Sequence, residues 1–202
     1  MSSVQPRIPP RPVDEWDDDV DQALSVLSVQ GHGAPSGAPK RPSSHIIGIY
    51  AWHPDLIRGW MPFSNHLRRS SLDDRVRELA IIRTAWLSGG EYEWAQHVRM
   101  SRANGWLTDA ELEAISLGSE APEWSADDAA VLQAVDQMVQ SKNVTSPVWT
   151  ELERQFTRQQ LIDLVFTVGT YDMHAMAFAT LGLQLEPGMQ GFPSSHRAEG
   201  RD

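Results

Sequence analysis

The segment from Glu91 to His97 carries acidic side chains and an imidazole within two turns of a predicted helix. Glu93 and His97 stand at positions i and i+4, so both side chains leave the same helix face and can act on one bound molecule. Glu78 lies in the apolar helical segment that precedes them. A carboxylate and an imidazole at this spacing suit general acid/base catalysis. We therefore take Glu78, Glu93 and His97 as candidate catalytic residues.

Each of these residues also has a purely structural explanation. Glu93 lies in the first turn of its helix, where negative charge stabilises the N-terminus. A single histidine on a helix face is more often structural than catalytic, and Glu78 can pair with a nearby arginine. The combination favours a site, because the Gly89–Gly90 turn folds the two helices back on each other and brings Glu78 towards Glu93 and His97.

Tyr92, Trp94 and Arg83 are candidates for binding a substrate. Tyr92 and Trp94 would supply aromatic walls to an apolar helical pocket. Arg83 would bind a substrate carboxylate or carbonyl, although an ion pair with an acidic residue explains it as well. Tyr171 and His174 lie in a late apolar segment, where a core or interface position is an equally good explanation.

Composition narrows the classes of function. The chain of 202 residues has 17 basic and 27 acidic residues and a formal charge of −10, so we expect a small-molecule substrate and neither nucleic acid nor membrane as a partner. It contains no cysteine, which removes disulfides and thiolate nucleophiles. We see no signal peptide and no apolar run of the roughly 18 residues that span a bilayer. These features predict a soluble cytoplasmic protein.

Helical signals fill the chain from residue 45 to residue 188, and no strand-like alternation competes with them, so we predict an all-α fold. The most apolar stretch, Leu161 to Leu185, predicts a buried helix that Glu186–Gly188 ends. Residues 1–44 predict an N-terminal arm and flexible connector, and residues 189–202 a loose tail. Capping residues and glycines mark the expected helix ends: Ser71 or Asp73, Gly89, Gly105, Thr108, Gly118, Ser125 and Thr157.

The span from Leu72 to Gly105 resembles the carboxymuconolactone decarboxylase family, relatives of alkyl hydroperoxidase D. The resemblance rests on an Arg-x-Arg-Glu-Leu-Ala-Ile-Ile-Arg helix, a Gly-Gly turn and a Glu-Tyr-Glu-Trp-x-x-His helix. Shorter similarities extend it along most of the chain, at Arg7–Pro10, His53–Leu56 and Val168–Tyr171. The resemblance implies an alkyl hydroperoxidase D-like helical bundle.

The hydroperoxidase branch of that family uses a glutamate, two cysteines and a histidine. The family spacing places the glutamate at Glu78, the cysteines at Gly90 and Glu93, and the histidine at His97. Both thiols are missing, so we reject thiol peroxidase and disulfide reductase activity. The cysteine-free decarboxylase branch keeps a Glu-x-x-x-His pair, which Glu93 and His97 match.

The resemblance to the decarboxylase branch implies a lyase that decarboxylates, isomerises or dehydrates a small oxygenated carbon acid without a cofactor. Two other hypotheses remain. Glu93 and His97, with Glu78 or His174, could hold a divalent metal ion, although no HExxH pattern supports this. The chain could also be a non-catalytic oligomeric scaffold or ligand-binding protein. Family members associate through apolar helix faces, so the resemblance implies a homo-oligomer, a trimer or a hexamer.

Overall fold

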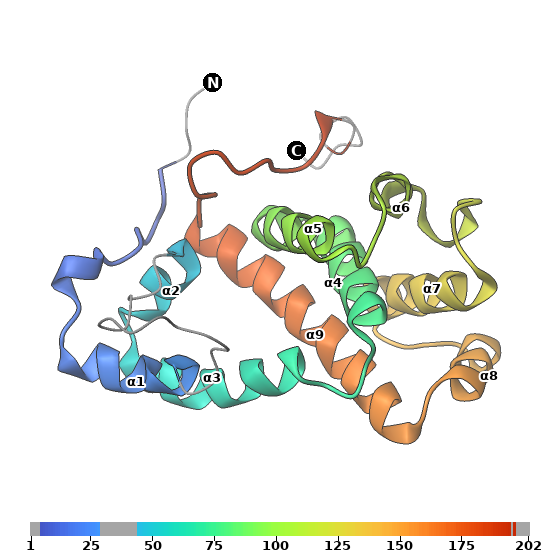
Figure 1. The fold of residues 1–202 in the computed structure, drawn as a ribbon, viewed down its shortest axis with the longest axis horizontal. Coiled ribbons are helices and arrows are strands. Elements are labelled where there is room, and N and C mark those ends of the chain that lie inside the picture. Colours follow the sequence, from blue (N-terminus) through green and yellow to red (C-terminus); the bar gives the residue numbers. More distant parts are fainter. Residues whose placement is uncertain (1–4, 29–43, 195, 197–202) are drawn as a thin grey trace. The chain divides into compact units, whose positions relative to one another are not determined.

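The computed structural model describes residues 5–28, 44–194 and 196, most of which lie in helices (Figure 1). No β-strand occurs in these residues, which confirms the expected all-α fold. None of the described helices is long and apolar enough to cross a membrane. The chain divides into two compact units, one made of Met1–Arg69 with Thr180–Glu186 and the other of Ser70–Ala179 with Pro187–Asp202.

The first unit contains the 3-10 helix η1 (Val13–Glu15) and the helices α1 (Asp18–Ser28), α2 (His45–Tyr50) and α3 (Pro54–Arg68). Its core is the seam where α1 packs on α3, with Val20 and Ile57 fully buried. The backbone N–H of Arg7 donates to the carbonyl of Leu181, which ties the N-terminal segment to the end of the last helix.

The first compact unit continues past residue 44, where we expect the arm to end, as far as Arg69. The physical reason is that α1 buries its apolar stripe against α3, so the N-terminal segment shares a core with the helices that follow it. Most of the expected flexible connector, residues 29–43, lies outside the described residues.

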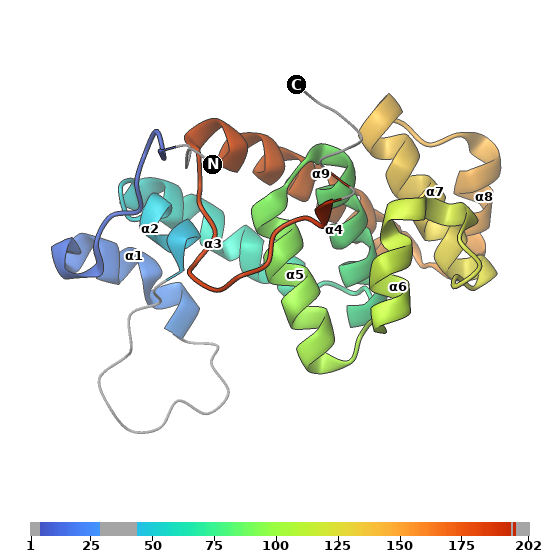
Figure 2. The ribbon, with the colours of Figure 1, turned by 90° about the horizontal axis from the view of Figure 1, so that it is seen from above.

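The second unit contains the helices that carry the candidate site. They are α4 (Asp74–Ser88), α5 (Glu91–Asn104), α6 (Asp109–Ala114), η2 (Ile115–Glu120), α7 (Ala126–Ser141), α8 (Ser146–Gln155) and most of α9 (Arg158–Leu181). Helix α4 is central, since it packs on α5, α7 and η2 and is buried on all sides from Arg77 to Trp86. Figure 2 shows α4 beside α5.

The expected helix ends are confirmed where local capping decides them. Asp73 caps α4 by accepting a hydrogen bond from Arg75 N–H, and Gly105 ends α5 in a left-handed conformation with φ 67°. Thr108 and Glu111 form a reciprocal capping box at α6. Thr157 and Gln160 exchange the same pair of bonds at the start of α9. These signals lie within four residues of the ends that they fix.

Two local expectations are wrong in detail. Helix α9 ends at Leu181, four residues before the end of the apolar stretch, because Gly182 adopts a left-handed conformation with φ 72°. The tail after Met189 is not loose at its start. Phe192 donates its backbone N–H to Glu91 and places its ring 5.7 Å from that of Trp86.

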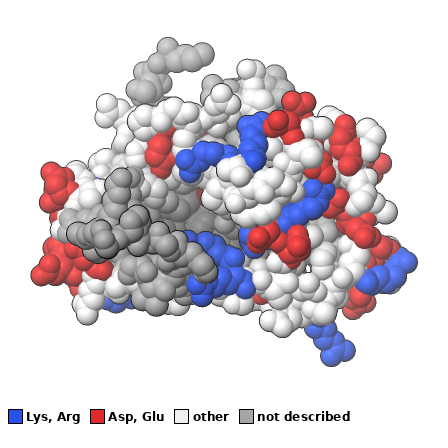
Figure 3. Space-filling view, in the orientation of Figure 1, with Lys and Arg blue, Asp and Glu red and all other residues white. Residues whose placement is uncertain are grey.

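On the face drawn in Figure 3, the basic side chains stand in separate groups, with acidic or uncharged side chains between them. They do not merge into a continuous basic surface on that face. This distribution fits a chain with a formal charge of −10.

Candidate functional site

The turn between α4 and α5 brings the two helices together at the site. Gly89 ends α4 with φ 69°, a left-handed conformation that costs glycine little. Gly90 follows in a crowded place, because a Cβ there would lie 2.9 Å from Glu93 Oε2 and 3.0 Å from Ala175 Cβ. The missing side chain at residue 90 therefore makes room for the Glu93 carboxyl and for the approach of α9.

Glu78 of α4 and His97 of α5 form a direct pair. His97 Nδ1 lies 2.6 Å from Glu78 Oε2, and Glu78 is only 1% exposed. When the carboxylate accepts, Nδ1 carries the proton and the lone pair of the imidazole is at Nε2. Arg77 Nε lies 3.6 Å from the other oxygen of Glu78, so the carboxylate also faces a positive charge.

The Glu93 carboxyl is buried and has no hydrogen-bond partner among the residues that the structure describes. Glu93 is 3% exposed, and neither Oε1 nor Oε2 accepts or donates a hydrogen bond within the described residues. Burial disfavours the charged form and raises the pKa of the Glu93 carboxyl to about 7. At neutral pH this group therefore exchanges a proton readily in either direction.

Helix α9 closes the other side of the cluster with a run of aromatic contacts. The Tyr171 ring meets the His97 ring edge to face, with ring centres 5.0 Å apart, and meets His174 at 5.7 Å. His174 stacks on Phe178 at 4.9 Å. Burial, with a smaller contribution from the charge of His97, lowers the pKa of His174 to about 4. His174 is therefore a neutral imidazole at neutral pH.

The structure thus brings the three predicted catalytic residues to one cluster between α4, α5 and α9. Glu93 and His97 share a face of α5, and Glu78 joins them through His97. The cluster combines an imidazole oriented by a carboxylate with a carboxyl group that titrates near neutrality. Such a pair can take a proton from a bound molecule and return one.

The predicted substrate-binding residues lie in different places. Tyr92 is buried beside the cluster, where its ring meets Phe178 at 6.0 Å and its hydroxyl accepts a hydrogen bond from Gln96. Trp94 points elsewhere on α5, and its ring centre lies 5.2 Å from that of Trp86. These two indoles line a cavity on the side of α5 away from Glu93.

Arg83 is held by a structural ion pair. Its guanidinium donates two hydrogen bonds to the Asp136 carboxylate, at 2.6 and 2.9 Å, and a third to the Ile115 carbonyl. The residue is 6% exposed and joins α4 to α7 and η2. The structure therefore does not bring Arg83 to Glu78 and His97, and its donors are used in holding the unit together.

Tyr171 and His174 are the members of the cluster that sequence reasoning did not select. A tyrosine and a histidine three residues apart share one face of a helix, and here that face belongs to an otherwise apolar segment. The three-residue spacing of two polar rings in an apolar helix was the sequence pattern that could have identified them. Within the described residues, no three His, Asp or Glu side chains are grouped as a metal-binding site.

Comparison with known proteins agrees with this architecture. Residues 54–137 match the model of the Carboxymuconolactone decarboxylase family, which confirms the resemblance seen in the sequence. This match contains Glu78, Glu93 and His97. No curated protein matches the chain.

Solved structures share the fold at low sequence identity. An alkylhydroperoxidase AhpD core protein from Ralstonia eutropha JMP134 is 16% identical, with a TM-score of 0.70 over 90% of this chain and 93% of that chain. A protein of unknown function from Agrobacterium tumefaciens, described as a candidate antioxidant defence protein AhpD, is 19% identical, with a TM-score of 0.63 over 68% of this chain and 94% of that chain.

A third structure is a variant of the debrominase Bmp8 in complex with 2,3,4-tribromopyrrole. It is 11% identical, with a TM-score of 0.70 over 98% of this chain and 97% of that chain. Such identities establish the AhpD-like fold. Because one fold carries many reactions, the chemistry of this chain has to be argued from its own residues.

Proposed function

We propose that this chain, whose residues 54–137 match the Carboxymuconolactone decarboxylase family, catalyses proton transfer to or from carbon in a small oxygenated carbon acid. The observation that carries the proposal is the buried Glu93 carboxyl, which has a pKa of about 7 and shares a face of α5 with the His97 that Glu78 orients. Thiol chemistry is closed to a chain that contains no cysteine.

In the proposed reaction, Glu78 is a positioning residue. It accepts the Nδ1 proton of His97, so that Nε2 presents its lone pair as a general base. His97 takes a proton from the substrate, and the electron pair that is left moves onto the adjacent carbonyl as an enolate. Glu93, in its protonated form, returns a proton to carbon. The substrate is isomerised when the proton returns to a different carbon.

Dehydration uses the same two groups, and decarboxylation needs only the proton donor Glu93, with His97 facing the substrate beside it. When a substrate carboxylate leaves as carbon dioxide, the electron pair of the broken carbon–carbon bond forms the enolate, and Glu93 protonates it. When a hydroxyl group leaves, Glu93 protonates that hydroxyl after His97 has taken the carbon-bound proton, and water departs. The proposed class is therefore a cofactor-independent lyase or isomerase.

Exchange of carbon-bound hydrogen with solvent tests the step that isomerisation and dehydration share. The protein is incubated in D₂O with small lactones and 3-oxo acids, and deuterium incorporation is followed by NMR together with carbon dioxide release. We expect catalysed exchange or decarboxylation that Glu93→Gln and His97→Gln each slow by about 10²–10⁴-fold. Glu123→Gln, the same chemical change at an exposed position, should have no effect.

Equal activity of the wild type and both site variants, with the helical circular dichroism spectrum unchanged, would contradict the acid/base scheme. Activity of none of the proteins on any of these compounds would also count against it, and would favour a non-catalytic ligand-binding member of the family.

We also propose that the protein is a homo-oligomer, with a trimer or hexamer as the expected state. The support is a stripe of exposed apolar side chains along α9, at helical spacing: Ile162, Val165, Phe166, Met173 and Met176, with exposures of 41% to 65%. Contiguous exposed apolar surface on a helix is typical of a protein–protein interface.

Light scattering tests the assembly directly. We expect the wild type to be larger than a monomer at micromolar concentration, and Met176→Glu to reduce its mass, because a charge in an apolar interface is costly. Arg158→Glu, which places the same charge at an exposed position at the start of the same helix, is the control and should leave the mass unchanged. A monomeric wild type would remove the proposal.

A further inference from the structure

A second concave site lies on the side of α5 that faces away from the acid/base cluster. Ala95, Val98 and Arg102 line it, and at 100° per residue they project opposite to Glu93 and His97. The cavity has a volume of about 930 Å³, within the size range of small-molecule sites. Glu78, Glu93 and His97 are not among the residues that line it.

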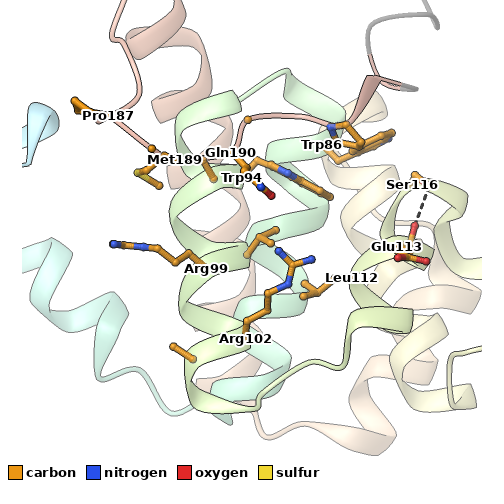
Figure 4. A pocket seen from close by; sticks show the side chains of 16 residues that line it. Trp86, Trp94, Arg99, Arg102, Leu112, Glu113, Ser116, Pro187, Met189 and Gln190 are labelled. Atoms are coloured by element: carbon orange, nitrogen blue, oxygen red, sulfur yellow. Dashed lines mark hydrogen bonds between the residues drawn. The ribbon is translucent and has the colours of Figure 1, made fainter.

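The inner wall of this cavity is aromatic and apolar. Trp86 and Trp94 stand side by side, with ring centres 5.2 Å apart, and Leu112 of α6 adds an aliphatic surface (Figure 4). Indole faces bind flat apolar rings well, through offset or edge-to-face contacts. The shape and chemistry of this wall favour a planar aromatic group.

The chain after α9 forms another wall of the cavity. Residues 187–191 and 193 line this wall. The ring centre of Phe192 lies 5.4 Å from that of Trp94, and the backbone N–H of Phe192 donates to the Glu91 carboxylate. His196 Nε2 lies 3.0 Å from the carbonyl oxygen of Trp86. These contacts hold the segment against α4 and α5, so the cavity wall is in place before a ligand binds.

Three charged side chains line the cavity, Arg99, Arg102 and Glu113, and Arg102 is the one placed nearest to its apolar wall. Figure 4 shows its side chain reaching from α5 towards Leu112 and Trp94. Arg102 Nε donates to Asp109 Oδ1 at 2.7 Å, and the side chain is 50% exposed. Because Asp109 takes only the Nε proton, the two Nη groups of Arg102 can donate to a ligand. An arginine typically binds a carboxylate with two parallel hydrogen bonds.

We propose that this cavity binds a planar aromatic carboxylate, with its ring against Trp94 and Leu112 and its carboxylate at Arg102. Glu113 lines the α6 side of the cavity, so a second anionic group on the ligand would be repelled there. This binding does not depend on the acid/base chemistry of Glu93 and His97.

Isothermal titration calorimetry with 2-naphthoate and its neutral analogue 2-naphthamide tests the proposal. We expect 2-naphthoate to bind at least about tenfold more tightly than the amide, because a hydrogen bond to a charged group is stronger. Arg102→Gln should reduce naphthoate affinity to that of the amide. Arg154→Gln, which breaks another exposed arginine–carboxylate pair, should change nothing.

Asp109→Asn gives a prediction of opposite sign. This substitution removes the anionic partner of the Arg102 guanidinium, so naphthoate should bind several-fold more tightly. If Arg102 served only to pair with Asp109, the affinity for naphthoate would not increase. Equal affinities for the acid and the amide, or unchanged binding by Arg102→Gln, would overturn the proposal. Loss of naphthoate binding in His97→Gln would also overturn it, since the ligand would then lie at the acid/base cluster.

Discussion

The buried carboxyl of Glu93 should make the stability of the protein depend on pH, and Glu93→Gln should remove that dependence. The glutamine side chain has nearly the same shape and cannot ionise. It therefore leaves the packing between Gly90 and Ala175 in place while it removes the charge. The variant thus isolates the free-energy cost of a buried negative charge.

The magnitude follows from the pKa of the Glu93 carboxyl. A folded-state value of about 7 against an ordinary 4.5 corresponds to about 3 kcal/mol of unfolding free energy. The folded chain binds this proton more tightly than the unfolded chain, so the stabilisation is complete below pH 4.5 and is lost as the pH rises through about 7. At pH 8 the wild type therefore carries the whole cost, and Glu93→Gln does not.

Urea unfolding followed by circular dichroism, at intervals from pH 4.5 to pH 8, measures the difference. We expect the two proteins to have similar unfolding free energies near pH 4.5 and the variant to be more stable by about 3 kcal/mol near pH 8. For a chain of this size, that difference raises the melting temperature by roughly 6–12 °C.

Glu123→Gln is the matched control, because it makes the same chemical change at an exposed position. Its stability should follow that of the wild type at every pH. If Glu93→Gln also followed the wild type, or became less stable than the wild type as the pH rose, the Glu93 carboxyl would be charged and paired in solution. The assignment of Glu93 as a neutral proton donor would then be wrong.

Three further variants test other parts of the second unit. The pKa of His174 is lowered to about 4 from 6.5, so the wild type loses stability as the pH falls from 6.5 to 4. His174→Gln should remove about 3 kcal/mol of this fall in the unfolding free energy. The same fall in the variant would show that the imidazole is accessible to protons in the folded chain. Gly90→Ala should lower the unfolding free energy, measured with urea, by about 1–3 kcal/mol, because the added Cβ meets Glu93 and Ala175 closely. Gly59→Ala is the control and should be neutral or stabilising, because its Cβ meets open space. Equal effects of the two variants would refute the crowding at residue 90. Arg83→Met should lower the unfolding free energy by about 3 kcal/mol, because it leaves the Asp136 carboxylate without its partner. The double variant Arg83→Met/Asp136→Met should recover part of that loss. If Arg83→Met were stable but inactive, the result would support a role of Arg83 in substrate binding.

The helix ends and the three candidate site residues could be predicted from sequence to different extents. Capping at Asp73, Thr108 and Thr157 depends on bonds between neighbours in the chain, so composition and spacing were enough. The family spacing selected Glu78 and His97, and in the folded chain His97 Nδ1 of α5 lies 2.6 Å from Glu78 Oε2 of α4. The end of α9 at Gly182 was missed, because the apolar pattern continues past the residue that breaks the helix.

The sequence by itself determined the all-α fold, the absence of thiol chemistry and the shared helix face of Glu93 and His97, because each follows from composition or from spacing along one helix. Only the tertiary structure decided the raised pKa of the Glu93 carboxyl, about 7, because it comes from burial of that group in the folded chain. It also decided that Arg83 faces Asp136 and not the site. Burial and pairing are set by residues far apart in the chain, so no local pattern records them.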